Sequence, residues 1–257
     1  QIQSGEYGYP VLFKHFTDEI LPALVDVGGG SGTGSFFMDD STWPAKYNNV
    51  PMMADWGRSQ LFIHRLTKDG ASFKQADEEF IKLSQISDVD VDASGRMYMA
   101  AWDRAGYKGN PDKGFVVRAV PKQWDYIPFP IVSELSIDEL ADYMKSGSAV
   151  ARLHAQQELI NRKNGDKALL EIAEDKSLSL ASRVAGIFGY AQAAGQSSIE
   201  NLVRLAEDQE VKEFVLRALT DRKNQAVNVP LEPFLEALNS SNDRLRVAAT
   251  VGLGRMG

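Results

Sequence analysis

Hydrophobic and polar residues alternate in short runs over much of the first half of the chain, and this period-two pattern predicts β-strands. The runs after residue 50 are "VPMMADW", "QLFIHRLT", "DGASF", "EEFIKL", "SDVDVD", "RMYMAAW" and "GFVVRAV". Gly, Asn, Asp and Pro residues lie between them, as is usual for turns. No run here has the period of the helix that joins parallel strands, so we predict antiparallel sheets.

The strand region contains an internal repeat with an offset of 46 residues. At this offset "MADWGR" matches "MAAWDR", so Trp56 corresponds to Trp102 and Arg58 corresponds to Arg104. The four-stranded blades of a β-propeller repeat at roughly 40–50 residues. We therefore predict that the strand region is part of a β-propeller.

The repeat also predicts where the blades lie. Residues 50–82 are expected to form most of one blade and residues 86–120 most of the next, with residues 1–49 belonging to an earlier blade. A few blades cannot close a propeller ring. We therefore expect this chain to be a piece of a longer protein, in which residues 1–120 are the C-terminal part of the propeller.

From residue 136 onward, apolar residues recur at helical spacing and predict paired helices. The first helix of each pair is expected at "SIDELADYM", "DKALLEIAED", "SIENLVRLAED" and "PLEPFLEAL". A basic residue recurs in each second helix: Arg152, Arg183, Lys212 and Arg246. We predict a HEAT-like α-solenoid over residues 136–257. The prolines of residues 121–135 favour an extended linker before it.

Charge and composition exclude several classes of protein. The 257 residues carry a net charge of −7 with scattered Lys and Arg, so we predict no nucleic-acid partner. The chain has no cysteine, which excludes disulfides, thiolate catalysis and covalently attached c-type haem within it. No apolar stretch approaches the roughly 20 residues of a transmembrane helix, so we expect no membrane span in this chain.

The run "LVDVGGGSGTGSFF", residues 24–37, has the composition of a cofactor loop. It lacks the Lys of a P-loop and the third Gly of the dinucleotide-binding fingerprint. "LVDVGGGSG" closely resembles the first motif of S-adenosylmethionine-dependent methyltransferases, for which Asp55 would bind the ribose. That motif needs a helix directly after it, and Pro44 would break such a helix. We therefore keep a methyltransferase as a minor alternative. We expect Gly30 and Gly32 to lie in a loop between propeller strands. If this loop has a function, we expect it to line a pocket.

Several runs are distinctive of one family: "WPAKYNN", "MMADWGRSQLFIHRLTKDGASF", "DVDVDASGRMYMAAW" and "GYKGNPDKGFVVRAV". Together with the helical repeats, they resemble the membrane-bound dehydrogenase propeller domains of large haem-binding proteins of planctomycetes and verrucomicrobia. In that family HEAT-like repeats follow the propeller, and a CxxCH cytochrome domain usually comes further along. The propeller is also distantly similar to soluble glucose and sorbosone dehydrogenases, which use pyrroloquinoline quinone.

The resemblance implies that the intact protein oxidises a sugar or related alcohol and passes electrons to a cytochrome domain. Pyrroloquinoline quinone and c-type haem would then be its cofactors, and its location would be periplasmic or at the cell surface. This chain lacks the cytochrome and most of the blades, so we expect it to be inactive by itself. The alternative is a non-catalytic scaffold that binds a glycan or a protein, with the protein partner on the solenoid.

The candidate site lies where equivalent loops of adjacent blades meet. Its predicted members are Gly30, Gly32, Asp55, Trp56, Arg58, Trp102, Asp103 and Arg104. Arginine pairs bidentately with carboxylates, such as those of a quinone cofactor or an acidic sugar, and tryptophan stacks on a sugar or cofactor ring. The structural alternative is that the tryptophans pack between blades and the arginines pair with Asp55 or Asp103.

The sequence offers one candidate catalytic base and no convincing metal site. His15 is the candidate, because histidine titrates near neutral pH. Asp88, Asp90 and Asp92 alternate as in a calcium loop, but Met99 occupies the position of its final Glu. We therefore predict a solvated strand face at these acids and no metal.

Overall fold

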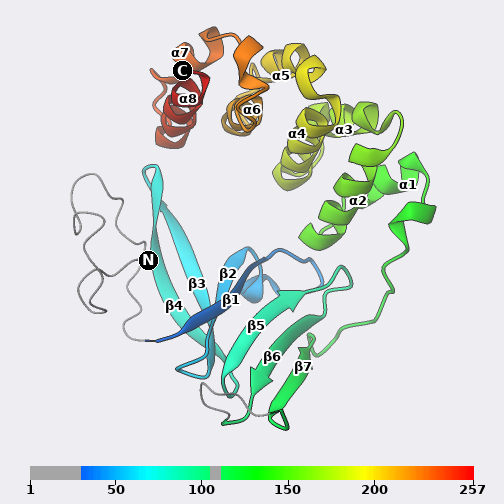
Figure 1. Ribbon diagram of the computed structural model, residues 1–257, viewed down its shortest axis with the longest axis vertical. Helices are drawn as coiled ribbons and strands as arrows, with labels where there is room; N and C mark the ends of the chain where they lie inside the picture. Colours follow the sequence, from blue (N-terminus) through cyan, green and yellow to red (C-terminus); the bar gives the residue numbers. More distant parts are fainter. Residues whose placement is uncertain (1–29, 105–110) are drawn as a thin grey trace.

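Antiparallel sheets occupy the first part of the chain and helices the second (Figure 1). The computed structural model describes residues 30–104 and 111–257. The strands are β1 (Gly32–Met38), β2 (Val50–Asp55), β3 (Gln60–Asp69), β4 (Ser72–Lys82), β5 (Ile86–Val91), β6 (Met97–Trp102) and β7 (Gly114–Ala119). This order confirms the predicted mixed fold class, with antiparallel sheets ahead of helices.

The strands form two sheets whose strand order follows the chain. The first sheet has the order β1-β2-β3-β4 and the second the order β5-β6-β7, with every neighbouring pair antiparallel. Strands β1 and β2 lie against β5, so the two sheets share one hydrophobic core. The core side chains alternate along the strands, and they include Met38, Met52, Ala54, Leu61, Ile63, Val89, Met97 and Met99.

Strand β1 corrects the expectation for the described part of residues 1–49. We predicted an earlier blade there, but β1 pairs with β2 and belongs to the same sheet as residues 50–82. Gly34 permits this packing, because a Cβ atom there would lie 2.6 Å from the backbone nitrogen of Val89 in β5. The glycine run therefore leads into a strand, whereas a methyltransferase motif requires a helix at this point.

Strands β3 and β4 form one long hairpin. Their pairing runs from Gln60 opposite Lys82 to Asp69 opposite Ser72. We predicted separate strands at "DGASF" and "EEFIKL", but β4 is continuous, because the mostly exposed polar residues between them still pair through their backbone. Gly70 at the tip has a φ of +59°, a conformation that favours glycine.

The helices follow in pairs, as the sequence predicted. They are α1 (Ile137–Tyr143), α2 (Ala149–Asn161), α3 (Gly165–Glu174), α4 (Leu180–Ala194), α5 (Ile199–Leu205), α6 (Lys212–Leu219), α7 (Glu232–Ala237) and α8 (Asp243–Met256). Short 3-10 helices lie at Ala45–Tyr47, Val132–Glu134, Gly195–Ser198 and Ala226–Asn228. Several α-helices begin at a side chain that accepts a hydrogen bond from a backbone N–H of the first turn: Ser136, Ser148, Ser179 and Asn242.

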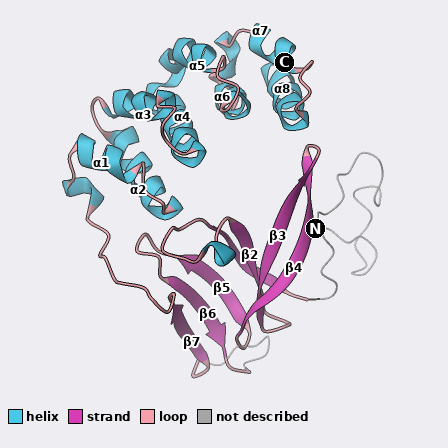
Figure 2. Cartoon of the chain, turned by 180° about the vertical axis from the view of Figure 1, so that it is seen from behind, coloured by secondary structure: helices cyan, strands magenta, loops and turns pink. Residues whose placement is uncertain are grey.

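Consecutive helix pairs stack into an arc. Helix α1 packs on α2, α3 on α4, α5 on α6 and α7 on α8, and the second helices of successive pairs also pack on one another. Figures 1 and 2 show α2, α4, α6 and α8 along the inside of the arc, facing the sheets. We call these four helices the inner row.

Close packing within the pairs depends on a position three residues after the recurring basic residue. The residues at this position are buried, and they are Ala155, Gly186, Val215 and Ala249. A Cβ atom at Gly186 would lie 2.8 Å from the carbonyl oxygen of Leu169 and 2.8 Å from the backbone nitrogen of Ala173. The glycine therefore lets α4 approach the backbone of α3.

The helices contact the sheets near both ends of the arc. Near α2, the side chain of Arg152 pairs with Asp39, and the backbone N–H of Ala149 donates to the Asp39 carbonyl oxygen at 2.7 Å. Near α8, the tip of the β3–β4 hairpin approaches the helix, and the guanidinium of Arg244 lies 5.4 Å from the centre of the Phe73 ring. The arc therefore contacts the sheets near both of its ends, and Figure 1 shows the tip of the β3–β4 hairpin pointing toward α8.

Candidate functional site

The predicted site at the edge of the sheets brings two tryptophans together. Trp56 follows β2 and Trp102 ends β6, and their ring centres lie 6.3 Å apart with an angle of 88° between the ring planes. This edge-to-face arrangement is favourable for aromatic rings. The 46-residue repeat thus places equivalent turns of the two sheets at one edge.

Asp55 organises the turn that follows β2. Its side chain is buried, and Oδ1 accepts hydrogen bonds from the backbone N–H groups of Ser31 at 3.1 Å and Arg58 at 2.9 Å. The Nε atom of Arg58 lies 3.9 Å from Oδ2. A Cβ atom at Gly30 would overlap Oδ2. This carboxylate therefore holds the chain before β1 against the β2–β3 turn. The structural alternative had given Asp55 only a pairing with an arginine, and Arg58 does lie at ion-pair distance from it.

The remaining predicted residues lie around this turn or outside the described residues. We expected Gly32 in a loop, but it begins β1 and pairs with Asp55 in register. Asp103 and Arg104 are exposed, and the backbone of Arg104 has a φ of +57°. His15 lies outside the described residues. A ligand-binding role for Arg104 and the two tryptophans stays a prediction.

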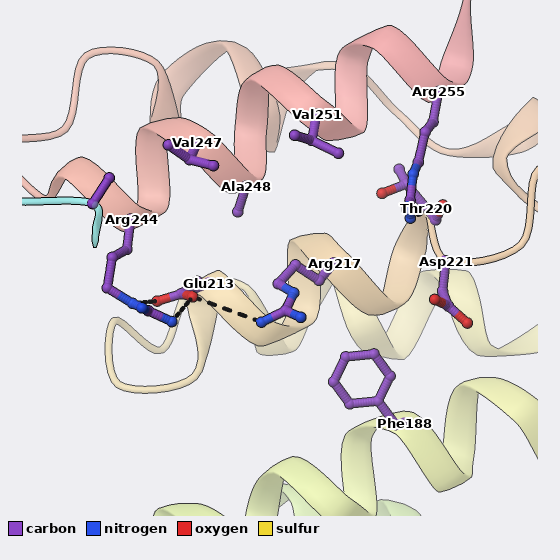
Figure 3. A pocket seen from close by; sticks show the side chains of 11 residues that line it. Phe188, Glu213, Arg217, Thr220, Asp221, Arg244, Val247, Ala248, Val251 and Arg255 are labelled. Atoms are coloured by element: carbon purple, nitrogen blue, oxygen red, sulfur yellow. Dashed lines mark hydrogen bonds and ion pairs between the residues drawn. The ribbon is translucent and has the colours of Figure 1, made fainter. Parts of the chain in front are cut away.

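A pocket that the sequence did not locate lies on the inner row of helices (Figure 3). Its volume is about 390 Å³, and it lies between α4, α6, α8 and Ala71 at the tip of the β3–β4 hairpin. Its charged lining consists of Glu213, Arg217, Asp221, Arg244 and Arg255. Its apolar lining includes Phe188, Val247, Ala248 and Val251. We call it the α6–α8 groove.

A bidentate ion pair connects the two helices at one end of this groove. The Nη2 and Nε atoms of Arg244 donate to the two carboxylate oxygens of Glu213 at 2.8 and 3.1 Å. Only 15% of the Glu213 side chain is exposed. A fork of this kind occupies both carboxylate oxygens and neutralises the charge of Glu213.

Arg217 and Arg255 keep hydrogen-bonding capacity toward the groove. The side chain of Arg217 is 54% exposed, and its Nη1 atom lies 3.9 Å from Glu213, which is beyond hydrogen-bond distance. The Nη1 atom of Arg255 donates to the carbonyl oxygen of Thr220 at 3.2 Å. A guanidinium carries five N–H donors in a planar fork. Both arginines can therefore bind a further carboxylate.

Apolar surface lies beside these cations. Val247 and Val251, one turn apart on α8, are 50% and 49% exposed. A second hollow of about 390 Å³ shares both valines and Ala71 with the groove and is also lined by Arg246 and Thr250. The exposed face of α8 therefore offers a continuous binding surface at the tip of the hairpin.

The sequence carries a weak signal for this groove. Arg244, Val247, Val251 and Arg255 recur at spacings of three and four residues, so they share one face of a helix. The sequence predicted a protein partner on the solenoid but did not single out these residues. Their exposure depends on how closely α6 and the hairpin approach α8, and a helical pattern does not contain that distance.

No protein-family model matches the chain, and no curated protein matches it. In the described part of the chain, no group of three or more His, Asp or Glu residues is placed to hold a metal ion. None of the helices in residues 30–104 and 111–257 has the length and hydropathy needed to span a bilayer. The family resemblance and its implied cofactors stay predictions.

Proposed function

We propose that this chain is a protein-binding scaffold. In this proposal the two sheets are consecutive blades of a β-propeller, the helices are a HEAT-like solenoid, and the α6–α8 groove receives a segment of a partner protein. The observation that carries the proposal is the groove itself, a hollow on the inner row where three arginines lie beside half-exposed valines.

The arrangement of the sheets and helices supports this proposal. Each sheet has antiparallel strands in chain order, as propeller blades have, and an offset of 46 residues relates their equivalent turns. Each helix pair packs on the next through the inner row. Solenoids of paired helices commonly bind partners along their extended concave surfaces.

The chemistry of the groove also suits non-covalent recognition. Arginine is enriched among the residues that dominate protein–protein binding, because its planar fork forms two directed hydrogen bonds over an apolar stem. Burial of the half-exposed Val247 and Val251 side chains by a partner would be favourable. By contrast, the Asp55 carboxylate at the sheet edge is already engaged by backbone N–H groups of the fold.

Selection of short random peptides displayed on phage tests the scaffold proposal. The double variant Val247→Asp, Val251→Asp places two charges on the floor of the groove. Leu235→Asp is the matched control, because Leu235 is also 50% exposed but lies on the outer helix α7. We expect peptides selected on the wild-type chain to bind the control and to lose affinity for the double variant. Failure to select any peptide, or equal binding to the double variant, would overturn the proposal.

A second candidate function is the oxidoreductase that the family resemblance implies for the intact protein. The contact between Trp56 and Trp102 favours it, because two aromatic rings at one edge of adjacent sheets offer a surface for a sugar or quinone ring. To test this function, pyrroloquinoline quinone and calcium would be added to the intact protein, and sugars would be screened for oxidation with an artificial electron acceptor. Turnover that falls in an Arg104→Ala variant would support this function, and absence of turnover would count against it.

A further inference from the structure

The charge pattern of the α6–α8 groove indicates the chemistry of the segment that it binds. We propose that this segment is acidic and aliphatic. An Asp or Glu carboxylate pairs with Arg217 and Arg255, and a neighbouring aliphatic side chain packs on Val247 and Val251. The inference rests on the scaffold function proposed above and adds the class of ligand.

The first step in the argument is that Arg217 forms only a long ion pair with Glu213, which Figure 3 marks by a dashed line. Both oxygens of Glu213 already accept hydrogen bonds from Arg244, at 2.8 and 3.1 Å. Arg217 lies 3.9 Å from the same carboxylate, too far for a hydrogen bond, and 54% of its side chain is exposed. An incoming carboxylate therefore competes little with Glu213 for the donors of Arg217.

Arg255 extends the cationic surface toward the C-terminal end of α6. Figure 3 shows its side chain reaching from α8 toward Thr220. It donates one hydrogen bond to the Thr220 carbonyl oxygen at 3.2 Å, while the Thr220 hydroxyl donates to the carbonyl oxygen of Leu216 at 3.1 Å. The hydrogen bond to Thr220 orients the guanidinium, and its other N–H groups can bind a ligand.

The net charge of the lining favours an anionic group. Three arginines and two acids line the groove, so it is locally positive although the chain carries a net charge of −7. One of the acids, Glu213, is paired with Arg244, and the other, Asp221, is exposed. Asp221 lies one turn after Arg217, and the two arginines together outweigh its single negative charge. We therefore place the ligand carboxylate between Arg217 and Arg255.

The aliphatic part of the ligand follows from the exposed face of α8. Val247 and Val251 are half exposed, and both line the groove and the adjoining hollow. A wholly charged segment would leave this apolar surface in water. A wholly apolar segment would remove the guanidinium groups from water without giving them a partner, which is unfavourable. A segment that combines a carboxylate with an aliphatic side chain satisfies both surfaces.

The test uses the selected peptides, made with a fluorescent label and titrated by fluorescence anisotropy. We expect their consensus to contain Asp or Glu beside Leu, Ile or Val. The double variant Arg217→Gln, Arg255→Gln should weaken binding by about tenfold or more, because a hydrogen bond to a charged group contributes at least about that factor. Arg204→Gln is the control, since Arg204 is an exposed arginine of α5 that pairs with Glu174 at 2.6 Å. It should leave the affinity unchanged.

The outcomes distinguish this inference from the scaffold function. Two outcomes would overturn the acidic–aliphatic ligand and leave the scaffold function standing. In the first, the selected peptides contain no acidic residues. In the second, the peptides bind the arginine double variant normally but lose affinity for the valine double variant. Failure to select any peptide overturns the scaffold function and this inference with it. Replacing the acidic residue of the peptide by its amide should weaken binding to the wild-type chain much more than binding to the arginine double variant.

Discussion

Arg183 of α4 and Asp208 of the next helix pair form an ion pair at 2.8 Å. The side chain of Arg183 is fully buried and also donates to Glu210 at 2.8 Å and to the carbonyl oxygen of Ala173 at 3.0 Å. One guanidinium thus joins α3, α4 and the connection between α5 and α6. It links two neighbouring helix pairs through hydrogen bonds as well as through apolar packing.

Replacing Arg183 with alanine should destabilise the chain by about 3 kcal/mol, because truncating one partner of a buried ion pair leaves the other without compensation. Urea denaturation followed by circular dichroism measures this loss. Arg204→Ala removes an exposed arginine from a pair with Glu174 and should cost less than about 1 kcal/mol. Equal losses in the two variants would contradict the linking role of Arg183.

The same ion pair predicts that stability falls in acid. The hydrogen bond from Arg183 lowers the pKa of Asp208 below its usual value. The pKa of Asp208 is lower in the folded state than in the unfolded state. Its ionised carboxylate therefore stabilises the folded chain fully above the unfolded-state pKa of roughly 3.9. This stabilisation is lost as the pH falls through the folded-state pKa. Urea midpoints measured between neutral pH and acid should fall less steeply for Asp208→Asn than for the wild type.

Two helical glycines should respond to alanine in opposite directions. Gly186→Ala should destabilise the chain by roughly 1–3 kcal/mol, because the added Cβ atom meets the backbone of α3. Gly254→Ala should stabilise it by about 0.5–1 kcal/mol, because nothing lies within 4 Å of a Cβ atom there and alanine favours the helix. Thermal denaturation of the two variants measures both effects. A stabilised Gly186→Ala variant would show that α3 and α4 do not approach so closely.

The turn after β2 should depend on the Asp55 side chain. Asp55→Ala leaves the backbone N–H groups of Ser31 and Arg58 without their acceptor, so we expect a loss of about 1–3 kcal/mol. Asp103→Ala, at an exposed position after β6, should change the stability by less than about 0.5 kcal/mol. Chemical denaturation compares the two variants. A stable Asp55→Ala variant would argue that this carboxylate serves a ligand and not the fold.

The helix pairs could be predicted from the sequence because their signals are local. The apolar spacing and the capping serines lie within a few residues of the turns that they stabilise. One detail needed the structure. Lys212 is the first residue of α6, whereas Arg183 is the fourth residue of α4. The lysine lies 3.7 Å from Glu236 in the following helix α7, whereas Arg183 pairs with acids of the α5–α6 connection.

The partner of β1 could not be predicted in the same way. Residues 39–49 separate it from β2, and its two glycines suggested a loop. Pairing between strands depends on contacts across such a connection, and Gly34 is needed because β5 packs closely against it. The composition of a segment does not show which backbone will lie beside it.

By itself, the sequence determined that antiparallel strands precede paired helices and that Trp56 and Trp102 occupy equivalent turns, because hydrophobic period and internal repeat can be read along the chain. Only the tertiary structure decided that Asp55 holds backbone groups of the fold and that Arg217 and Arg255 line one groove. Hydrogen-bond partners and exposed surface depend on distances between elements that are remote in sequence, and no local pattern contains those distances.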